Sequence, residues 1–255
     1  MTKYVIDKMN VEFTHQQVFV DVFLAEDVQA EKTSLTLYDI VGLAYPVHAF
    51  NAPKIVVDFA RRLPSVDSID TFILSTAGDS HPLNMASSGL LIKTLHEKGF
   101  RVYYDKQFIM PSNFIIKDDE AKVQDKLGKA IAEIPKAVRE ILNRVALQQK
   151  SSLSAKIVAV LGRLEWVGLK CGKFFRADGK CRRCGLCAMK CPNRNISTSE
   201  SGVVFGRKCG LCMRCVYLCS ENAIKARWPF RFIGFDAWYE NEELCVAKRF
   251  ADRQE

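Results

Sequence analysis

The sequence predicts an α/β protein in which a parallel β-sheet domain is followed by a small α+β domain rich in cysteine. Patterns of buried strands alternate with helical patterns over residues 1–150, as is typical of a parallel sheet covered by helices. Eight of the ten cysteines then fall between residues 181 and 219. We expect residues 1–150 to form the sheet domain and 151–172 a linker with a short helix. Residues 173–230 would form the cysteine-rich domain and 231–255 a C-terminal tail.

The first part of the sheet domain begins with a helical pattern. Residues 2–13 place apolar side chains four positions apart, which predicts an amphipathic helix. Residues 17–24 alternate and contain β-branched side chains, which predicts a strand. A buried strand is expected over 39–45. A helix should follow over 52–62, with Pro53 in its first turn.

The second part of this domain continues the alternation. Residues 70–75 predict another buried strand, and a helix is expected over 84–98 with Gly99 at its C-terminal cap. A further strand should begin at 101–104, and a long charged helix should cover 118–149.

The cysteines form two groups with the same spacing, C-x2-C-x2-C-x3-C. Each cysteine of the second group lies 28 residues after its equivalent in the first group. In this bacterial spacing three cysteines bind one 4Fe–4S cluster, and the fourth binds the other cluster. We therefore expect one cluster to be bound by Cys181, Cys184, Cys187 and Cys219, and the other by Cys209, Cys212, Cys215 and Cys191.

Two other interpretations of the cysteines remain. Zinc sites usually pair two C-x2-C units across a longer interval and use four ligands for each metal. A disulfide framework requires a secreted chain, but the polar start over residues 1–8 has no hydrophobic signal-peptide region. We expect the protein to be cytoplasmic.

Three further residues, one at the end of the second motif and two outside both motifs, do not follow the repeat. Ser220 stands where the first motif has Pro192, although the ligand type is kept at the neighbouring cysteine. Cys171 and Cys245 have no partner at a suitable spacing, so we expect both to be plain thiols.

The formal net charge of +8 is concentrated in the cysteine-rich part of the chain. Residues 171–255 contain 16 basic and 9 acidic side chains, a net charge of +7, whereas residues 1–170 are nearly neutral at +1. Each oxidised cluster with four thiolates carries about −2, so this excess is expected to balance the clusters and to favour an acidic redox partner. Nucleic acid is not expected to bind. The basic residues concerned are Lys180, Arg182, Arg183, Lys190, Arg207, Lys208 and Arg214.

No run of 18 apolar residues occurs in the sequence, so no transmembrane helix is predicted. The most apolar segment, residues 153–169, is interrupted by Lys156, Arg163 and Glu165. We expect no membrane partner.

Parallel sheets bind ligands at the carboxyl ends of their strands. Two predicted loops lie at such ends, over residues 45–50 and 75–84. Each candidate also has a purely structural explanation: His48 could cap the next helix, Tyr45 could belong to the core, and Gly78 could permit a turn.

Three segments of this domain, followed by the double cysteine motif, resemble the flavodoxin–ferredoxin fusion family of anaerobic bacteria. These segments are Tyr45-Pro-Val-His-Ala-Phe-Asn-Ala-Pro53, Thr76-Ala-Gly-Asp79 and Met110-Pro-Ser-Asn113. The resemblance implies a flavodoxin-like domain whose FMN exchanges electrons with two 4Fe–4S clusters in a ferredoxin-type domain. The residues that it implies for FMN binding are Tyr45, Pro46, Val47, His48, Thr76, Ala77, Gly78 and Asp79.

One feature of flavodoxin-like chains is missing. They open with a buried strand and a glycine- and threonine-rich loop that holds the FMN phosphate at a helix N-terminus, and this sequence has no such loop. Thr2 would be the last residue of that motif. The missing strand would be a central one, between residues 18–24 and 40–45. Either the start codon is misassigned or the phosphate site has been lost. Under the first explanation, the strand and loop should be encoded just upstream.

The sequence thus predicts electron transfer through two clusters, coupled to FMN if FMN binds. A flavin-dependent reductase supplied with electrons by the cysteine-rich domain, and an iron–sulfur redox sensor, remain as alternatives. No H-E-x-x-H or G-x-G-x-x-G motif is present, and nothing in the sequence identifies a substrate or shows whether the protein is an enzyme.

Overall fold

The structure is a computed structural model that describes all residues except 115, 164–170, 200–201 and 228–255. The chain divides into two compact units. Unit 1 comprises Met1–Ser112 and Asp119–Val167, and unit 2 comprises Asn113–Asp118 and Gly168–Glu255. The tail expected over 231–255 lies outside the described residues.

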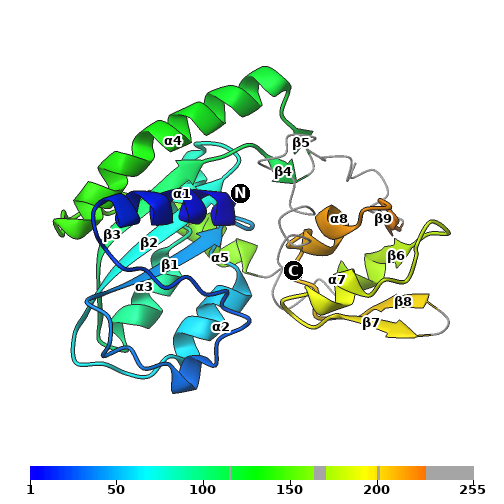
Figure 1. Cartoon of the computed structure of the whole chain (residues 1–255), viewed down its shortest axis with the longest axis horizontal. Helices are drawn as coiled ribbons and strands as arrows, with labels where there is room; N and C mark the ends of the chain where they lie inside the picture. The colour runs from blue at the N-terminus through cyan, green and yellow to red at the C-terminus, as the bar shows by residue number, and fades with distance from the viewer. Residues whose placement is uncertain (115, 164–170, 200–201, 228–255) are drawn as a thin grey trace. The chain divides into compact units, whose positions relative to one another are not determined.

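Unit 1 is built on a parallel three-stranded sheet with the strand order β1-β2-β3 (Figure 1). The strands are β1 (Ile40–Pro46), β2 (Ile69–Ala77) and β3 (Phe100–Ile109). Near the carboxyl ends, Tyr45 lies opposite Ser75, which in turn lies opposite Gln107. The predicted α/β class with a parallel sheet is confirmed.

Helices pack around this sheet in pairs. They are α1 (Thr2–His15), α2 (Lys54–Arg62), α3 (Gly89–His96), α4 (Glu120–Leu142) and α5 (Leu153–Gly162), with short 3-10 helices η1 (Ala30–Lys32) and η2 (Pro82–Ala86). Helix α1 packs against α4 and β1, α2 packs against α3, and α5 packs against η2. Apolar side chains of β1 and β2, such as Leu43 and Ile73, form a core with Val57 of α2 and Leu91 of α3.

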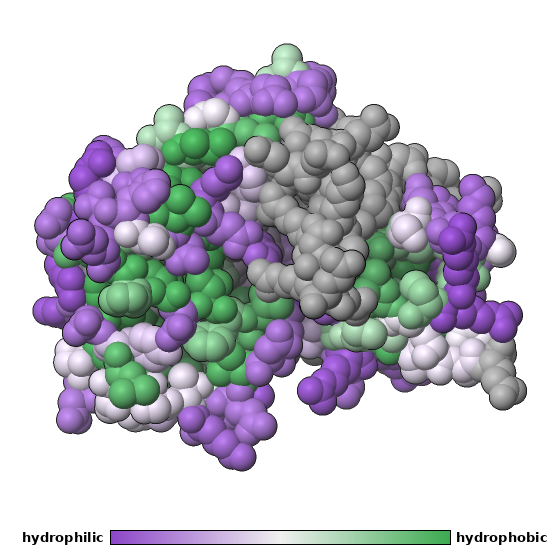
Figure 2. Space-filling view, in the orientation of Figure 1, coloured by the Kyte–Doolittle hydropathy of each residue, from purple (hydrophilic) through white to green (hydrophobic). Residues whose placement is uncertain are grey.

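The strand predicted over residues 17–24 is wrong. This segment has no regular structure, and the side chains of Phe19 and Phe23 are fully exposed and 64 % exposed. The described part of the chain pairs β1 only with β2, so no neighbouring strand is available for residues 17–24. Figure 2 accordingly shows hydrophobic residues interspersed with hydrophilic ones on the visible surface of unit 1.

Two predicted helices are shorter than expected. The helix predicted over 84–98 is divided into η2 and α3, while Gly99 has the left-handed φ of 88° expected after a helix end. Helix α4 ends at Leu142 instead of residue 149 because the chain turns back to the sheet. Leu147 donates its backbone N–H to the Tyr103 carbonyl at 2.9 Å and accepts one from Asp105 at 2.8 Å.

Unit 2 contains two similar halves, each with a cysteine loop, a short helix and paired strands. The helices are α7 (Leu186–Met189) and α8 (Arg214–Leu218), preceded by η3 (Cys171–Phe174). Strand β6 (Phe175–Ala177) pairs with β9 (Ile224–Ala226), β7 (Ile196–Ser199) with β8 (Gly202–Phe205), and β4 (Asn113–Phe114) with β5 (Ile116–Lys117), all antiparallel.

The repeat of 28 residues extends to the strand pairing. Ala177 pairs with Ile224 in one two-stranded sheet, and Phe205 pairs with Ile196 in the other. Adding 28 to Ala177 and Ile196 gives Phe205 and Ile224. The two halves therefore have equivalent pairings as well as equivalent cysteines.

Among the described residues, no helix combines the length and the apolar character needed to cross a membrane.

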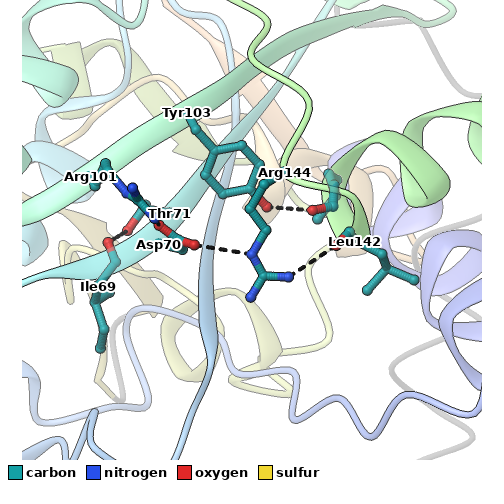
Figure 3. A network of polar contacts seen from close by, with 8 residues as sticks. Ile69, Asp70, Thr71, Arg101, Tyr103, Leu142 and Arg144 are labelled. Atoms are coloured by element: carbon teal, nitrogen blue, oxygen red, sulfur yellow. Dashed lines mark hydrogen bonds and ion pairs between the residues drawn. The ribbon is translucent and has the colours of Figure 1, made fainter.

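A network of polar contacts fixes the end of the sheet opposite the carboxyl ends of its strands (Figure 3). Asp70 of β2 accepts hydrogen bonds from Nε of Arg101 at 2.6 Å and from Nε of Arg144 at 3.0 Å. Beside them, the Tyr103 hydroxyl donates to the Ile141 carbonyl at 2.7 Å. Burial opposes ionisation of Asp70, but the hydrogen bonds from the two arginines outweigh it and hold its pKa below the usual value.

We expect Asp70→Asn to lower the free energy of unfolding at pH 7 by about 0.5–1 kcal/mol, because both arginines lose a partly exposed ionic partner. An acid with a lowered folded-state pKa stabilises the protein above its unfolded-state pKa, about 3.9, and this contribution disappears as the pH falls through the folded-state value. Urea unfolding at pH 7 and at acid pH measures the difference.

Asp125→Asn is the matched control, since Asp125 forms an ion pair with Lys129 across one turn of α4 at the surface. It should cost less than Asp70→Asn at pH 7. An Asp70→Asn effect that is the same at both pH values would contradict the ionic explanation.

Candidate functional site

The eight cysteines of the two motifs are all free thiols. Cys184 and Cys212, which are equivalent in the repeat, are exposed, whereas the other six are partly buried. We name the two predicted ligand sets group A (Cys181, Cys184, Cys187 and Cys219) and group B (Cys209, Cys212, Cys215 and Cys191).

Group B surrounds one cavity in unit 2. All four of its cysteines line this cavity, together with apolar side chains that include Phe175, Pro192, Leu211 and Met213. Cys191 comes from the first motif and the other three from the second. The fold therefore brings together the four cysteines that the crosswise spacing rule assigns to one cluster.

The electrostatic surroundings of the central cysteines divide in the same way. Burial raises the pKa of the Cys187 thiol, and negative charge on its group A neighbours would raise it further. Burial raises the pKa of Cys215 more strongly, and negative charge on the other members of group B, and to a smaller extent on Cys187, would raise it further. Cys187 thus lies near Cys219 of the second motif, just as Cys215 lies near Cys191 of the first.

The two cysteine loops share an uncommon backbone conformation. Left-handed φ values occur at three pairs of positions that are 28 residues apart: Arg183 (57°) and Leu211 (50°), Gly185 (76°) and Met213 (58°), Arg194 (46°) and Asn222 (47°). Each of the five non-glycine residues adopts a sparsely populated conformation that costs on the order of 1 kcal/mol. Such strain persists where the surrounding structure requires it, and here it recurs at equivalent positions of the two halves.

The fourth cysteine of each motif accepts a backbone hydrogen bond. The N–H of Asn195 donates to Sγ of Cys191, and the N–H of Ala223 donates to Sγ of Cys219, both at 3.3 Å. Hydrogen bonds to the sulfurs are one of the factors that set the reduction potential of an iron–sulfur cluster.

Asn195 also joins the two motifs through its side chain. Its Oδ1 accepts the backbone N–H of Lys208 at 2.5 Å, and its carbonyl accepts that of Gly206 at 2.7 Å. A Cβ on Gly172 would lie 1.9 Å from the Gly206 carbonyl oxygen, so only glycine fits there. Sequence reasoning missed Asn195, because its equivalent in the repeat is Ala223 and no motif distinguishes it.

Among the described residues, no three His, Cys, Asp or Glu side chains converge closely enough to hold a single metal ion. A 4Fe–4S cluster makes a different demand, since each thiolate binds its own iron at a separate corner of the cube. The grouped but separated thiols fit that demand better than they fit a mononuclear site.

Unit 1 places the predicted flavin-binding residues at the carboxyl edge of its sheet, but three of them are buried. Tyr45 is 0 % exposed, and its hydroxyl contacts Oγ of Ser87 at 3.3 Å. Thr76 is 4 % exposed and is hydrogen-bonded to the Thr2 hydroxyl at 2.7 Å, and Ala77 is buried beside it. The structural explanation thus holds for Tyr45.

The other five predicted residues reach the surface of this edge. Pro46 and Asp79 are exposed, and Val47, His48 and Gly78 are partly exposed. Asp79 organises its own loop, because its Oδ1 accepts from the backbone N–H of His81 and from Nδ2 of Asn84, both at 3.0 Å. Gly78 packs tightly, since a Cβ there would lie 3.2 Å from Cβ of Ser112.

A strained turn follows β1 at the same edge. His48 and Asn51 exchange backbone hydrogen bonds, and the two residues between them, Ala49 and Phe50, have left-handed φ values of 41° and 62°. Two-residue turns of this kind favour Asn and Gly. The ring of Phe50 packs against that of His81, with 6.3 Å between centroids.

Asn51 holds this turn against α5. Its Nδ2 donates to the Ala159 carbonyl at 2.8 Å and to the Ala49 carbonyl at 2.9 Å, and its Oδ1 accepts from Nε of Arg163 at 3.1 Å. The helix expected in the linker, α5, therefore packs on unit 1 and supports the candidate loop. The sequence offered no signal for this role of a single asparagine.

Buried polar groups lie beneath the same edge. Asp105 is 2 % exposed and accepts hydrogen bonds from Oγ of Ser88 at 2.5 Å and Nε2 of Gln149 at 3.0 Å. Burial raises its pKa above the usual value, against the opposing effect of these hydrogen bonds. Oγ of Ser75, both polar side-chain atoms of Gln107 and Oε1 of Gln149 are buried without a hydrogen-bond partner among the described residues. Such groups usually bind ordered water.

The sequence matches no family model. A search of curated proteins likewise gave no significant match. The interpretation of the site therefore rests on the cysteine spacing and on the geometry of unit 2.

Proposed function

We propose that this protein transfers electrons through two 4Fe–4S clusters bound by group A and group B. The observation that carries the proposal is the crosswise grouping of the thiols, in which each set takes three cysteines from one motif and the fourth from the other. When bound, each cluster supplies a one-electron redox centre. No described group acts as a catalytic acid, base or nucleophile in the proposal.

The chain's own residues have three tasks in this function. The left-handed loops direct the thiols, the N–H groups of Asn195 and Ala223 bind sulfur, and the apolar residues Phe175, Met213 and Val216 exclude water. Zinc explains this arrangement less well, because a mononuclear site requires four ligands converging on one ion. Reduced thiols are also what a cytoplasmic location would maintain.

The proposal for unit 1 is a flavodoxin-like domain in which a flavin could contact Pro46, Val47, His48, Gly78 and Asp79. Two loops and the strained turn at Ala49 and Phe50 support a binding site at this edge. Nothing in the sequence supplies the glycine-rich loop that holds an FMN phosphate. We therefore place the redox function chiefly in unit 2 and expect the flavin affinity of this chain to be low.

Metal content tests the proposal directly. Protein purified without oxygen should contain about eight iron and eight sulfide per chain, since two cubes of four are proposed. Iron and acid-labile sulfide are measured together with the visible absorbance. Stoichiometric zinc without iron would remove the basis for electron transfer.

The crosswise assignment predicts which variants resemble one another. Cys191→Ala should damage the same cluster as Cys215→Ala, and Cys219→Ala the same cluster as Cys187→Ala, because each pair belongs to one group. Each variant should retain about four iron. Low-temperature electron paramagnetic resonance of the reduced proteins identifies the remaining cluster.

The four variants serve as controls for one another, because Cys187 and Cys215, and likewise Cys191 and Cys219, are equivalent in the repeat. If the spectrum of Cys191→Ala matched that of Cys187→Ala instead, each motif would bind its own cluster and the crosswise assignment would be wrong.

Flavin binding is tested by comparing FMN with riboflavin, which lacks the phosphate. Because the chain lacks a phosphate loop, it should bind FMN and riboflavin weakly and with similar affinity. Adding the 255-residue chain should therefore quench the fluorescence of both flavins only at high protein concentration. Flavin fluorescence measures both titrations. Much tighter binding of FMN than of riboflavin would mean that the phosphate is held by other residues.

A further inference from the structure

The polypeptide around group B is strongly basic. Residues 185–217 contain five basic side chains, Lys190, Arg194, Arg207, Lys208 and Arg214, and a single acidic one, Glu200, which lies outside the described residues. This segment contains every cysteine of group B. It also contains Cys187 of group A, but four of its five cysteines belong to group B, so its positive charge lies mainly around that group.

Three of these side chains form what we name the basic rim: Arg194, Arg207 and Lys208. All three are exposed, and none of them makes an ion pair with another described residue. Asn195 places them together, because it follows Arg194 directly and accepts the backbone N–H groups of Gly206 and Lys208.

Among the described residues, two acidic side chains lie close to group A in the sequence, Asp178 and Glu221. Arg182 pairs with Glu221 at 3.3 Å, and Glu221 lies two residues after Cys219. Asp178 lies close to Lys180, whose backbone N–H it accepts at 3.0 Å. These two acidic side chains offset part of the positive charge around group A, so an approaching anion meets a weaker field there.

A partner could also approach group B closely. Cys212 is exposed, and it is preceded by Gly210 and Leu211, whereas the equivalent Cys184 is preceded by Arg182 and Arg183. A Cβ on Gly210 would lie 2.8 Å from Nδ2 of Asn193, so that flexible side chain would have to shift to accommodate it. The residues just before the exposed Cys212 thus carry no charged side chain that would keep a partner away from its sulfur.

The basic rim could instead serve only to balance the charge of the clusters. Exposed side chains are screened by water and salt and stabilise a partly buried anion little. Their long-range field, in contrast, steers charged partners and raises association rates. The exposure of all three side chains therefore favours a role in docking.

We propose that an acidic electron-transfer protein docks on the basic rim and exchanges electrons with the cluster of group B near Cys212. This inference rests on the proposed function, because it requires a cluster in group B. In the exchange one electron passes between the cluster and the redox centre of the partner, and no covalent bond is formed or broken.

Two cobalt(III) complexes of opposite charge test the field around the clusters. The protein, reduced with dithionite, is mixed in a stopped-flow instrument with tris(oxalato)cobalt(III), charge −3, or hexaamminecobalt(III), charge +3. Each cobalt gains one electron and becomes cobalt(II), and each cluster loses one. At low salt the anion should oxidise the wild-type protein faster than the cation does. The double variant Arg194→Glu/Arg207→Glu should lower the rate constant for the anion roughly tenfold and raise that for the cation.

Arg182→Glu/Arg183→Glu is the matched control, since it makes the same change of charge beside group A. It should alter the two rates much less. Equal slowing by both double variants, or no slowing by the Arg194/Arg207 variant, would overturn the proposal. Absorbance before mixing separates the two levels of inference, because wild-type protein without cluster absorbance would refute the proposed function itself.

Binding of a protein-sized probe gives a readout independent of electron transfer. Isothermal titration with an acidic two-iron ferredoxin should show binding that weakens as salt increases, and that Arg194→Glu/Arg207→Glu weakens about tenfold or more. Binding unaffected by this variant, or lost only in Arg182→Glu/Arg183→Glu, would place the docking surface elsewhere.

Discussion

Unit 2 depends on one geometric constraint: each short loop must turn several thiols toward a common centre. The two loops meet this demand with the same backbone, in which Arg183 and Leu211 adopt left-handed conformations at equivalent positions. The remaining architecture follows from these loops. Helices α7 and α8 lead away from them, and Asn195 and Ala223 then return a backbone N–H to the fourth sulfur. Apolar side chains of unit 2 then pack together around these loops and helices.

Sequence patterns predicted much of this fold because they record burial. The strands near 39–45, 70–75 and 101–104 and the helix near 2–13 all exist, since their apolar residues pack into a core. The strand at 17–24 failed for the same reason. Alternation shows that a segment could pair, but only a neighbouring strand makes it do so, and none of the described strands offers that edge.

The candidate sites were predictable to different degrees. Cysteine spacing is local and chemically specific, so groups A and B could be proposed from the sequence, and the four cysteines of group B do line one cavity. At the sheet edge the sequence could not tell the two faces of a strand apart, and Tyr45 and Thr76 proved to be buried. Asn51 and Asn195 were missed because their partners, Ala159 and Lys208, are brought close only by the fold.

Each short helix of unit 2 connects the two cysteine groups mechanically. Helix α8 contains Cys215 of group B and is followed directly by Cys219 of group A, and α7 contains Cys187 and leads to Cys191. A shift of the backbone at one cysteine group is therefore transmitted through a single turn of helix to the other group. Oxidation of an exposed thiol such as Cys184 would therefore perturb the cluster proposed for group B without removing it.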